Sequence, residues 1–426
     1  MERYNEYKDS GVQWLGEIPS HWDMQRWRFL LTENKVKNTD CKVKVQLQFK
    51  YGDIVRKANQ DEDADVLETI SKYTVVAPDD IMINGLNLNY DFISQRVAQV
   101  RENGVITSAY VSLRPTSLAC SRYYTYFLKS MDFKKMFHGM GTGIRLTLSY
   151  NELKNQFIPF PAIKEQQAIA DYLDTATAKI DEAIAQQQKM IDLLNERKQI
   201  IINNAVTKGI NPDVPMKDSG VDWIGKIPEH WEVLRIRYIG ESKNGLTYSP
   251  NDMVDEGNGI LVLRSSNIQD GKLAFEDNVY VKGAPGKLLV KKGDIIICSR
   301  NGSASLVGKC AIVEEDIYAS FGAFMMRFRS EHNSKYTYYL LTAAISHYKQ
   351  LFATSTINQL TLGIFADIKM PFVYDLQEQT KIAESLDLAI KKLDTAISNA
   401  SKQISLLQER KQIIINDVVT GKVKVC

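Results

Sequence analysis

Two short segments carry glycine patterns that other proteins use to hold a cofactor or a nucleotide. Residues 137–141 read FHGMG, the FxGxG pattern with which some methyltransferases cradle S-adenosylmethionine. An enzyme that methylates adenine at N6 also needs an Asn/Asp-Pro-Pro-aromatic tetrad to hold the flipped base, and the sequence contains no Pro-Pro pair. We therefore interpret these glycines as a loop or a turn.

The second pattern, residues 302–309, resembles a phosphate-binding loop but departs from it in two ways. Five residues separate Gly302 from Gly308 where the motif has four, and Cys310 follows the lysine in place of Ser or Thr. The five cysteines and five histidines are scattered and contain no C-x-x-C pair. The sequence thus predicts neither a nucleotide site nor a metal site, and no catalytic residues stand out.

Polar loops that follow apolar runs are better candidates for a functional site. In the major groove of DNA, Arg reads guanine and Asn or Gln reads adenine, with help from Ser and Thr, while Lys suits phosphates. In the second half of the chain such residues follow 260–263 and 295–297, two runs that we interpret as buried strands. The candidates there are Arg264, Ser266, Asn267, Ser299, Arg300, Asn301, Ser303, Lys309, Asn358 and Gln359.

The first half has a matching loop after the apolar run 81–83. Its candidates are Asn84, Asn87, Asn89, Arg96, Arg101 and Arg145. A comparison of GIRLTL at 143–148 with INQLTL at 357–362 predicts that Asn358 and Gln359 take the place of Ile144 and Arg145. Because Asn and Gly are often simple turn formers, the prediction is stronger for the loops as groups than for any one residue.

Bulk composition limits the classes of protein that the chain could be. The chain has 426 residues, 44% of them hydrophobic and 24% charged, with a net charge of +2; these values suit two or three globular domains. No apolar run approaches the roughly 20 residues of a membrane span, and the polar N-terminus lacks a signal-peptide core. We therefore expect a cytoplasmic protein without a membrane partner, in which any nucleic-acid surface depends on local charge.

A segment near the N-terminus is repeated in the second half of the chain. KDSGVQWLGEIPSHW at 8–22 returns as KDSGVDWIGKIPEHW at 217–231, always with an offset of 209. The repeated Trp14, Trp22, Trp223 and Trp231 are expected to anchor the start of each half in its core, since aromatic rings bury much area. Neighbouring polar residues could then face a partner.

A second repeat predicts two long helices. The segments that begin at Glu165 and Glu378 align without a gap at an offset of 213, and ERKQIIIN occurs in both. Neither segment contains an internal Gly or Pro, and Gly209 and Gly421 follow them as stop signals. Apolar residues at spacings of three and four give a heptad seam. The expected seam residues are Leu173, Ala176, Ile180, Ala183, Met190, Leu194, Ile201 and their counterparts in the second copy, together with Gln187, Arg197 and Arg410.

The predicted architecture is an α+β chain with a pseudo-two-fold internal repeat. Its expected parts are a globular head at 1–160, a helix at 161–210, a second head at 211–372 and a second helix at 373–426. If a pseudo-axis relates the halves, the two helices form an antiparallel coiled coil that separates the heads. A helix of about 43 residues would be roughly 64 Å long and could span a helical turn of DNA, about 34 Å.

The repeats and the loops together resemble the specificity subunit of a type I restriction–modification system. In the first head the resemblance rests on 104–115 and 139–154, and in the second on 260–273 and 291–313, so that it covers essentially the whole chain. It implies a non-catalytic subunit with two target-recognition domains. Each domain would read one half of a bipartite double-stranded DNA sequence.

The same resemblance implies the partners and cofactors. Two methyltransferase subunits would bind the repeated frame and methylate adenine at N6 with S-adenosylmethionine, and restriction subunits that use ATP and Mg would join for cleavage. This chain itself is expected to bind no cofactor. An alternative stays open: a structural adaptor that bridges two protein partners without reading DNA. The missing tetrad argues against a self-contained DNA methyltransferase.

Overall fold

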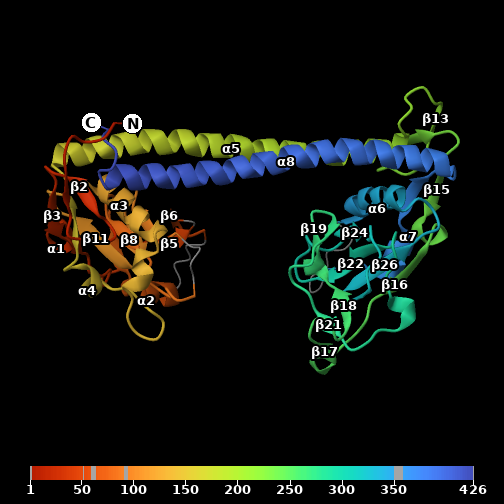
Figure 1. Cartoon of the computed structure of the whole chain (residues 1–426). Helices are drawn as coiled ribbons and strands as arrows, with labels where there is room; N and C mark the ends of the chain where they lie inside the picture. The colour runs from red at the N-terminus through yellow and green to blue at the C-terminus, as the bar shows by residue number, and fades with distance from the viewer. Residues whose placement is uncertain (1, 51, 59–63, 91–94, 350–357, 426) are drawn as a thin grey trace. The chain divides into compact units, whose positions relative to one another are not determined.

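The computed structural model describes residues 2–50, 52–58, 64–90, 95–349 and 358–425 (Figure 1). The chain has the predicted α+β fold and divides into two compact units. Unit 1 comprises residues 1–188 and 401–426, and unit 2 comprises residues 189–400. Each unit contains one head, the first part of one long helix and the last part of the other.

The head of unit 1 is built from short strands and helices, and its chain leaves through the long helix α5. The strands are β1 (Tyr7–Asp9), β2 (Glu17–Pro19), β3 (Asp23–Arg26), β4 (Leu31–Glu33), β5 (Leu47–Lys50), β6 (Asp53–Arg56), β7 (Thr74–Val76), β8 (Ile81–Ile83), β9 (Val97–Gln99), β10 (Gly104–Ile106), β11 (Val111–Pro115) and β12 (Phe157–Phe160). The helices are α1 (Trp27–Leu30), α2 (Ala64–Ser71), α3 (Ser121–Phe133), η1 (Met136–Gly139), α4 (Tyr150–Leu153) and α5 (Ile163–Lys208).

The head of unit 2 repeats this order with additional short strands, and its chain leaves through the long helix α8. The strands are β13 (Met216–Asp218), β14 (Lys226–Pro228), β15 (Glu232–Arg235), β16 (Glu241–Asn244), β17 (Met253–Val254), β18 (Ile260–Leu263), β19 (Ile268–Gln269), β20 (Lys272–Leu273), β21 (Tyr280–Val281), β22 (Ile295–Cys298), β23 (Arg300–Asn301), β24 (Cys310–Ile312), β25 (Ala319–Phe321), β26 (Met325–Arg329), β27 (Asn358–Gln359) and β28 (Lys369–Phe372). The helices are η2 (Ile236–Tyr238), η3 (Pro250–Asp252), η4 (Ser265–Asn267), η5 (Gly286–Leu288), α6 (Ser334–Tyr348), α7 (Leu362–Asp367) and α8 (Leu376–Val419).

Both heads share a four-stranded antiparallel sheet with the same strand order. The order is β4-β11-β8-β9 in unit 1 and β16-β26-β22-β24 in unit 2. The central strands β8 (IMI) and β22 (IIIC) are buried on both faces, because helix α3 or α6 covers one face and the strands of the outer region cover the other. An equivalent carboxylate precedes each of these strands: Asp80 pairs with Arg114, and Asp294 pairs with Arg329.

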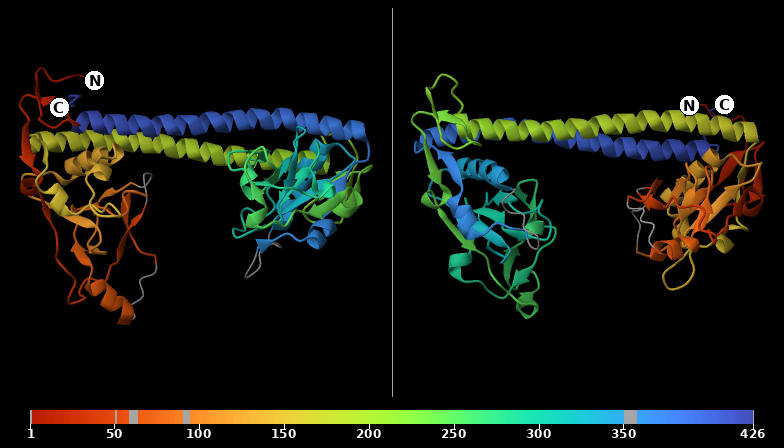
Figure 2. Two further views of the ribbon diagram at one scale, coloured as in Figure 1. Left: turned by 60° about the horizontal axis from the view of Figure 1, so that its bottom comes forward. Right: turned by 180° about the vertical axis from the view of Figure 1, so that it is seen from behind.

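The heads differ in the region beyond this common sheet. Unit 1 adds two separate ribbons, β5–β6 and β7–β10, whereas unit 2 adds a four-stranded sheet in which β18 and β25 run parallel. Each region has its own small apolar cluster. Figure 2 lets the two heads be compared from further directions. The frame is therefore duplicated closely, and the variable parts are confined to the outer lobes.

The duplicated opening motif closes on the first turn of the following long helix. The indole Nε1 of Trp22 donates to Glu165 at 2.9 Å, and that of Trp231 donates to Glu378 at 3.0 Å. Both rings are fully buried, which confirms the prediction that these tryptophans anchor the heads. His21 and His230 contact the same two carboxylates from the exposed side.

The glutamine that follows each of these glutamates ties the helix to the head. Gln166 is fully buried; its Oε1 accepts from the backbone N of Cys120, and its Nε2 donates to the carbonyl of Pro161. Gln379 makes the same two bonds, with Asn333 N and the Val373 carbonyl. The repeated Glu-Gln pair thus fixes where each helix begins.

The long helices end where the sequence predicts. Gly209 and Gly421 both adopt a left-handed backbone with φ of +74°. A Cβ on Gly421 would lie 2.3 Å from Pro19 Cδ, so only glycine fits beneath the opening motif at this end. The two chain termini lie side by side in unit 1, where Lys424 N donates to the Glu2 carbonyl at 2.9 Å.

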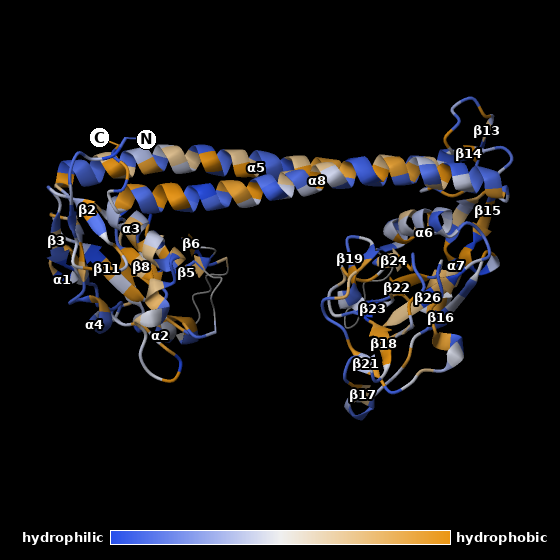
Figure 3. Cartoon of the chain, in the orientation of Figure 1, coloured by the Kyte–Doolittle hydropathy of each residue, from blue (hydrophilic) through white to orange (hydrophobic). Residues whose placement is uncertain are grey.

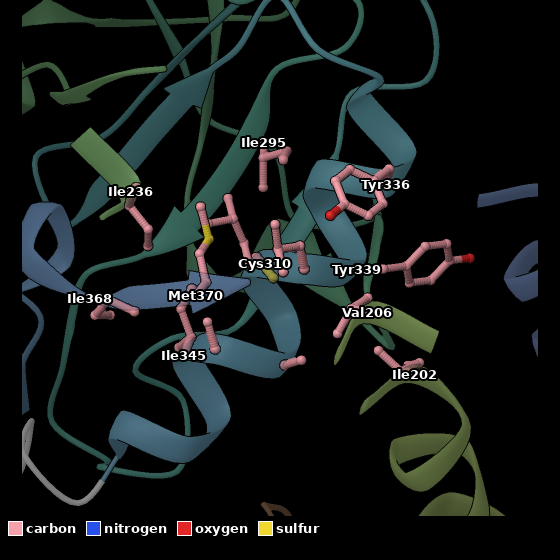
Figure 4. Close-up of a cluster of buried hydrophobic side chains, with 14 of the residues drawn as sticks. Ile202, Val206, Ile236, Ile295, Cys310, Tyr336, Tyr339, Ile345, Ile368 and Met370 are labelled. Carbon is pink, nitrogen blue, oxygen red and sulfur yellow. The ribbon is translucent and has the colours of Figure 1, made fainter. Parts of the chain in front are cut away.

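Inside each unit the two long helices pack antiparallel and contribute to the core of the head. In unit 2 the end of α5 inserts Ile202 and Val206 among side chains of the sheet and of α6 (Figure 4). In unit 1 the end of α8 does the same with Ile415, Val418 and Val419. The antiparallel arrangement predicted from pseudo-symmetry is confirmed in both units.

Most residues of the predicted heptad seam are buried or half-buried, which confirms them, but the prediction is wrong at three positions. Met190, Arg197 and Arg410 are exposed, and the lysine that follows each of the two arginines contacts the partner helix. Lys198 donates to Asp394 in unit 2, and Lys411 donates to Asp181 in unit 1, both at 2.7 Å. The two pairs are equivalent at the offset of 213, so the repeated ion pair occupies the seam where arginine was expected. Figure 3 shows apolar and polar residues interleaved along both helices.

The described part of the chain contains no helix that is both long enough and apolar enough to cross a membrane.

Candidate nucleic-acid interface

In unit 1 two loops pack against each other at the end of the central strand β8. Residues 84–90 follow this strand, and residues 142–147 form a hairpin closed by two hydrogen bonds between Thr142 and Thr147. Leu88 N donates to the Leu146 carbonyl at 3.2 Å, and Asn89 Nδ2 donates to the Ile144 carbonyl at 3.3 Å. The structure therefore brings the predicted Asn87, Asn89 and Arg145 into one neighbourhood.

Arg96 is not a surface residue, and the prediction that it contacts DNA directly is wrong. Its side chain is 1% exposed and donates through Nη1 to the carbonyls of Asn84 and Leu86, at 3.0 and 2.8 Å. Its own backbone N donates to Asp132, a carboxyl whose pKa is raised by burial. Arg96 thus holds the 84–90 loop in place from beneath.

The other arginines predicted in unit 1 lie apart from each other. Arg145 is exposed at the tip of the hairpin. Arg101 is exposed in the turn between β9 and β10, where it pairs with Asp53 at 3.5 Å. Asn84 is half-buried, and its Oδ1 accepts from Leu86 N. Only Arg145 adds positive charge directly to the paired loops.

In unit 2 the corresponding loops form a two-stranded ribbon from β23 and β27. Arg300 lies opposite Gln359, and Asn301 lies opposite Asn358. Directly opposed residues of an antiparallel pair project from the same face, and the next pair projects from the other face. Four of the predicted residues are therefore brought together, two on each face.

The two faces of this ribbon have different roles. Asn301 Nδ2 donates to Ser265 Oγ at 3.3 Å, and Asn358 Nδ2 donates to the Gly302 carbonyl at 3.2 Å, so both amides bond within the head. Gln359 is exposed, and the structure gives Arg300 no carboxylate partner among the described residues. Arg300 and Gln359 are the pair that remains available to a ligand.

Phe324 supports this pair and was not predicted from the sequence. The guanidinium of Arg300 lies over its ring, 5.2 Å from the centroid, although Phe324 itself is 58% exposed. The Phe324 carbonyl also accepts from the backbone N of Arg300 at 3.1 Å. A phenylalanine directly before Met325 and Met326 looks like a core residue in the sequence, so only the fold reveals its place.

The remaining candidates of unit 2 mostly hold the loops together. Asn267 is fully buried and bonds to the carbonyls of Ala274 and Asp277, so a direct DNA contact by its side chain is excluded in this conformation. Arg264 pairs with Asp277 at 2.8 Å. The other four candidates differ in burial: Ser299 is buried, Ser266 and Lys309 are half-buried, and Ser303 is exposed.

The predicted equivalence of Asn358 and Gln359 with Ile144 and Arg145 is wrong by two residues. Leu148 N bonds to the Gly85 carbonyl in unit 1, and Leu360 N bonds to the Ser299 carbonyl in unit 2, so these leucines correspond. The following Ser149 and Thr361 both cap a short helix. Gln359 therefore matches Thr147, because the shared leucine-threonine letters align in more than one register.

The two cysteines described near the unit 2 ribbon are not reactive nucleophiles. Burial raises the pKa of the Cys298 thiol beside the ribbon, and it raises the pKa of Cys310 to about 11, so both thiols stay protonated at neutral pH. Among the residues that the structure describes, no cluster of His, Cys, Asp or Glu could hold a metal ion. The arrangement suits recognition by hydrogen bonds and shape.

Comparison with known proteins identifies the class to which this fold belongs. The chain matches the family model described as "Type I restriction modification DNA specificity domain" over residues 97–191 and 228–404, which is more than half of its length. The chain therefore belongs to this family. Its members are the non-catalytic specificity subunits of type I restriction enzymes.

Individual relatives span the chain to different extents. It is 25% identical to the type I restriction enzyme MjaVIII specificity subunit of Methanocaldococcus jannaschii over 100% of this chain and 98% of the relative. It is 28% identical to the EcoKI specificity subunit of Escherichia coli over 46% of this chain and 44% of the relative. The fold is also similar to a solved chain described under "complex assembly and conformational transition of the type I R-M system", with a TM-score of 0.70 at 14% identity. The match covers 95% of this chain and 99% of the solved chain.

The different burial of two arginines gives a direct test of the unit 1 interface. We expect Arg96→Met to destabilise unit 1 by about 3 kcal/mol, because two loop carbonyls lose their buried donor. We expect Arg145→Ala to leave the thermal midpoint unchanged, because its side chain is exposed, and to weaken DNA binding. Thermal unfolding and gel shifts of both variants would measure this. An Arg96→Met variant that unfolds like the wild type would contradict the structural role.

Proposed function

We propose that the chain reads a bipartite DNA sequence, with one half-site read by each head. The observation that carries this proposal is the ribbon of unit 2, which presents Arg300 and Gln359 on one face. Arginine pairs with guanine and glutamine with adenine in the major groove, which is wide enough for a two-stranded ribbon. The cation–π contact with Phe324 restricts Arg300 before DNA arrives and so lowers the entropy cost of binding.

Unit 1 supports the same proposal with different residues. Its paired loops present Asn87, Asn89 and Arg145 at the equivalent end of the common sheet. Since the frames of the two units agree while these loops differ, the heads are suited to unlike half-sites. The antiparallel helices would then set the separation of the half-sites.

We further propose that the frame recruits two adenine-N6 methyltransferase subunits. The helices expose equivalent apolar residues at heptad spacing, Leu193 and Ile200 on α5 and Leu406 and Ile413 on α8. The first pair belongs to unit 2 and the second to unit 1, so each unit offers one such stripe. Apolar residues seven apart on a helix face are suited to packing against a partner helix.

The other components of the complex follow from this assignment. S-adenosylmethionine would bind to the methyltransferase subunits, while ATP and Mg would bind to restriction subunits that join for cleavage. This chain would bind none of them and would act in the cytoplasm, where its DNA target lies. A structural adaptor that reads no DNA could use the same apolar stripes, but it would give no role to Arg300 and to the exposed Gln359.

The DNA-reading proposal is tested by changes in sequence preference. The target would first be found by methylome mapping of a host that expresses the chain with its methyltransferase. We expect Arg300→Ala and Gln359→Ala each to relax one position of a single half-site, at a cost of about 1–3 kcal/mol, and to leave the other half-site unchanged.

The control for this experiment is Arg235→Ala, an exposed arginine of unit 2 that pairs with Asp367 away from the ribbon. It should keep the wild-type preference. Unchanged preference in both ribbon variants, or equal binding of the wild type to all DNA sequences, would count against the proposal.

The recruitment proposal predicts the stoichiometry of the complex. Leu193→Asp with Ile200→Asp should remove one methyltransferase subunit, and Leu406→Asp with Ile413→Asp should remove the other, because each pair places charge in one apolar contact. Native mass spectrometry would count the subunits. Leu388→Asp, at an exposed leucine outside both stripes, serves as the control. A complex that keeps two methyltransferase subunits in every variant would refute this arrangement.

A further inference from the structure

The most exposed large apolar side chain described in unit 1 lies at the tip of the hairpin loop. Ile144 is 96% exposed, and Tyr90 on the neighbouring loop is 75% exposed. We propose that Ile144 is an apolar wedge that enters DNA between two base pairs of the half-site read by unit 1. This inference rests on the proposed function and adds the mode of recognition.

The hairpin is built to hold its tip away from the head. Reciprocal hydrogen bonds join Thr142 and Thr147 at its base, at 3.1 and 2.9 Å. The Ile144 carbonyl is held by Asn89, and the Leu146 carbonyl by Leu88 N, so the backbone on both sides of the tip is anchored to the 84–90 loop. The loop before α4 projects from the end of unit 1 that is remote from its long helices (Figure 1).

The glycines around the tip explain how the hairpin turns and packs. Gly143, directly before Ile144, adopts φ of +78°, which a residue with a side chain would adopt only with strain. A Cβ on Gly141 would lie 2.8 Å from Leu88 Cδ1, so glycine there lets the two loops pack closely. The FHGMGTG segment thus has a use other than cofactor binding: it supports a narrow loop with one apolar side chain at its tip.

The chemistry of the tip fits a nucleic acid better than a protein partner. Neither loop contains Asp or Glu between residues 84 and 90 or between 133 and 148, and Arg145 lies directly beside Ile144. An arginine next to the wedge can neutralise a phosphate as the apolar side chain leaves water. The β-branched side chain of isoleucine is also stiff about χ1, so little conformational entropy is lost when it is fixed.

A wedge of this kind predicts which base step the half-site contains. Insertion of an apolar side chain unstacks one base step and kinks the duplex, and pyrimidine–purine steps resist this least. The half-site read by unit 1 should therefore contain a TA or CA/TG step at the point of contact. The preference for that base step would come from the deformability of the DNA, without a base-specific hydrogen bond.

The test uses the chain with its methyltransferase partner and the mapped target. 2-Aminopurine replaces adenine at successive positions of the half-site, and fluorescence transfer between labelled DNA ends reports bending. We expect the wild type to raise the fluorescence several-fold at one step other than the methylated adenine, and to bend the DNA there. Ile144→Ala should lose both signals and bind about tenfold more weakly, and Ile144→Leu should keep them.

The control variant is Ile210→Ala, at an exposed isoleucine of unit 2 outside the head loops. It should behave as the wild type. If the wild type binds the target specifically but neither signal depends on Ile144, the wedge is refuted and the proposed function stands. If the wild type shows no preference for any split sequence, the proposed function itself fails.

Discussion

The structure depends on the bond between a buried tryptophan and the first turn of a long helix. Trp22 with Glu165, and Trp231 with Glu378, lock each opening motif onto the helix that leaves the same head. A buried indole N–H without a partner would cost about 1–3 kcal/mol, so the glutamate cannot vary freely once the tryptophan is buried. This constraint accounts for the close repetition of segments some 150 residues apart within each half.

Duplication of the frame leaves the outer loops free to differ. The same central strand ends in a paired loop in unit 1 and in a ribbon in unit 2, while an equivalent Asp–Arg pair lies at the start of the strand in both units. A rigid sheet that carries variable loops is a common arrangement for recognition, because the scaffold fixes where the loops begin and end. The long helices are duplicated in the same way, because the ion pairs Lys198–Asp394 and Lys411–Asp181 occupy equivalent positions in the two units.

The repeats made the frame predictable, because two copies in one chain mark the residues that cannot change. The sequence alone could not separate base-facing residues from residues that hold the loops: Arg96 and Asn267 look like DNA contacts but are buried donors to loop carbonyls. It also could not align the loops, since one leucine-threonine pattern fits two registers, or show that Phe324 lies beneath Arg300. Those facts depend on contacts between segments distant in the chain.

We propose that the paired helices set the separation between the half-sites read by two unlike heads. This proposal is tested by inserting one heptad into both helices at equivalent positions, after Gln188 and after Ser401, and mapping the methylated sequences. Seven residues add about 10 Å of helix, so we expect the gap between half-sites to grow by about three base pairs while both half-site sequences stay the same. An unchanged gap, or altered half-sites, would contradict the account.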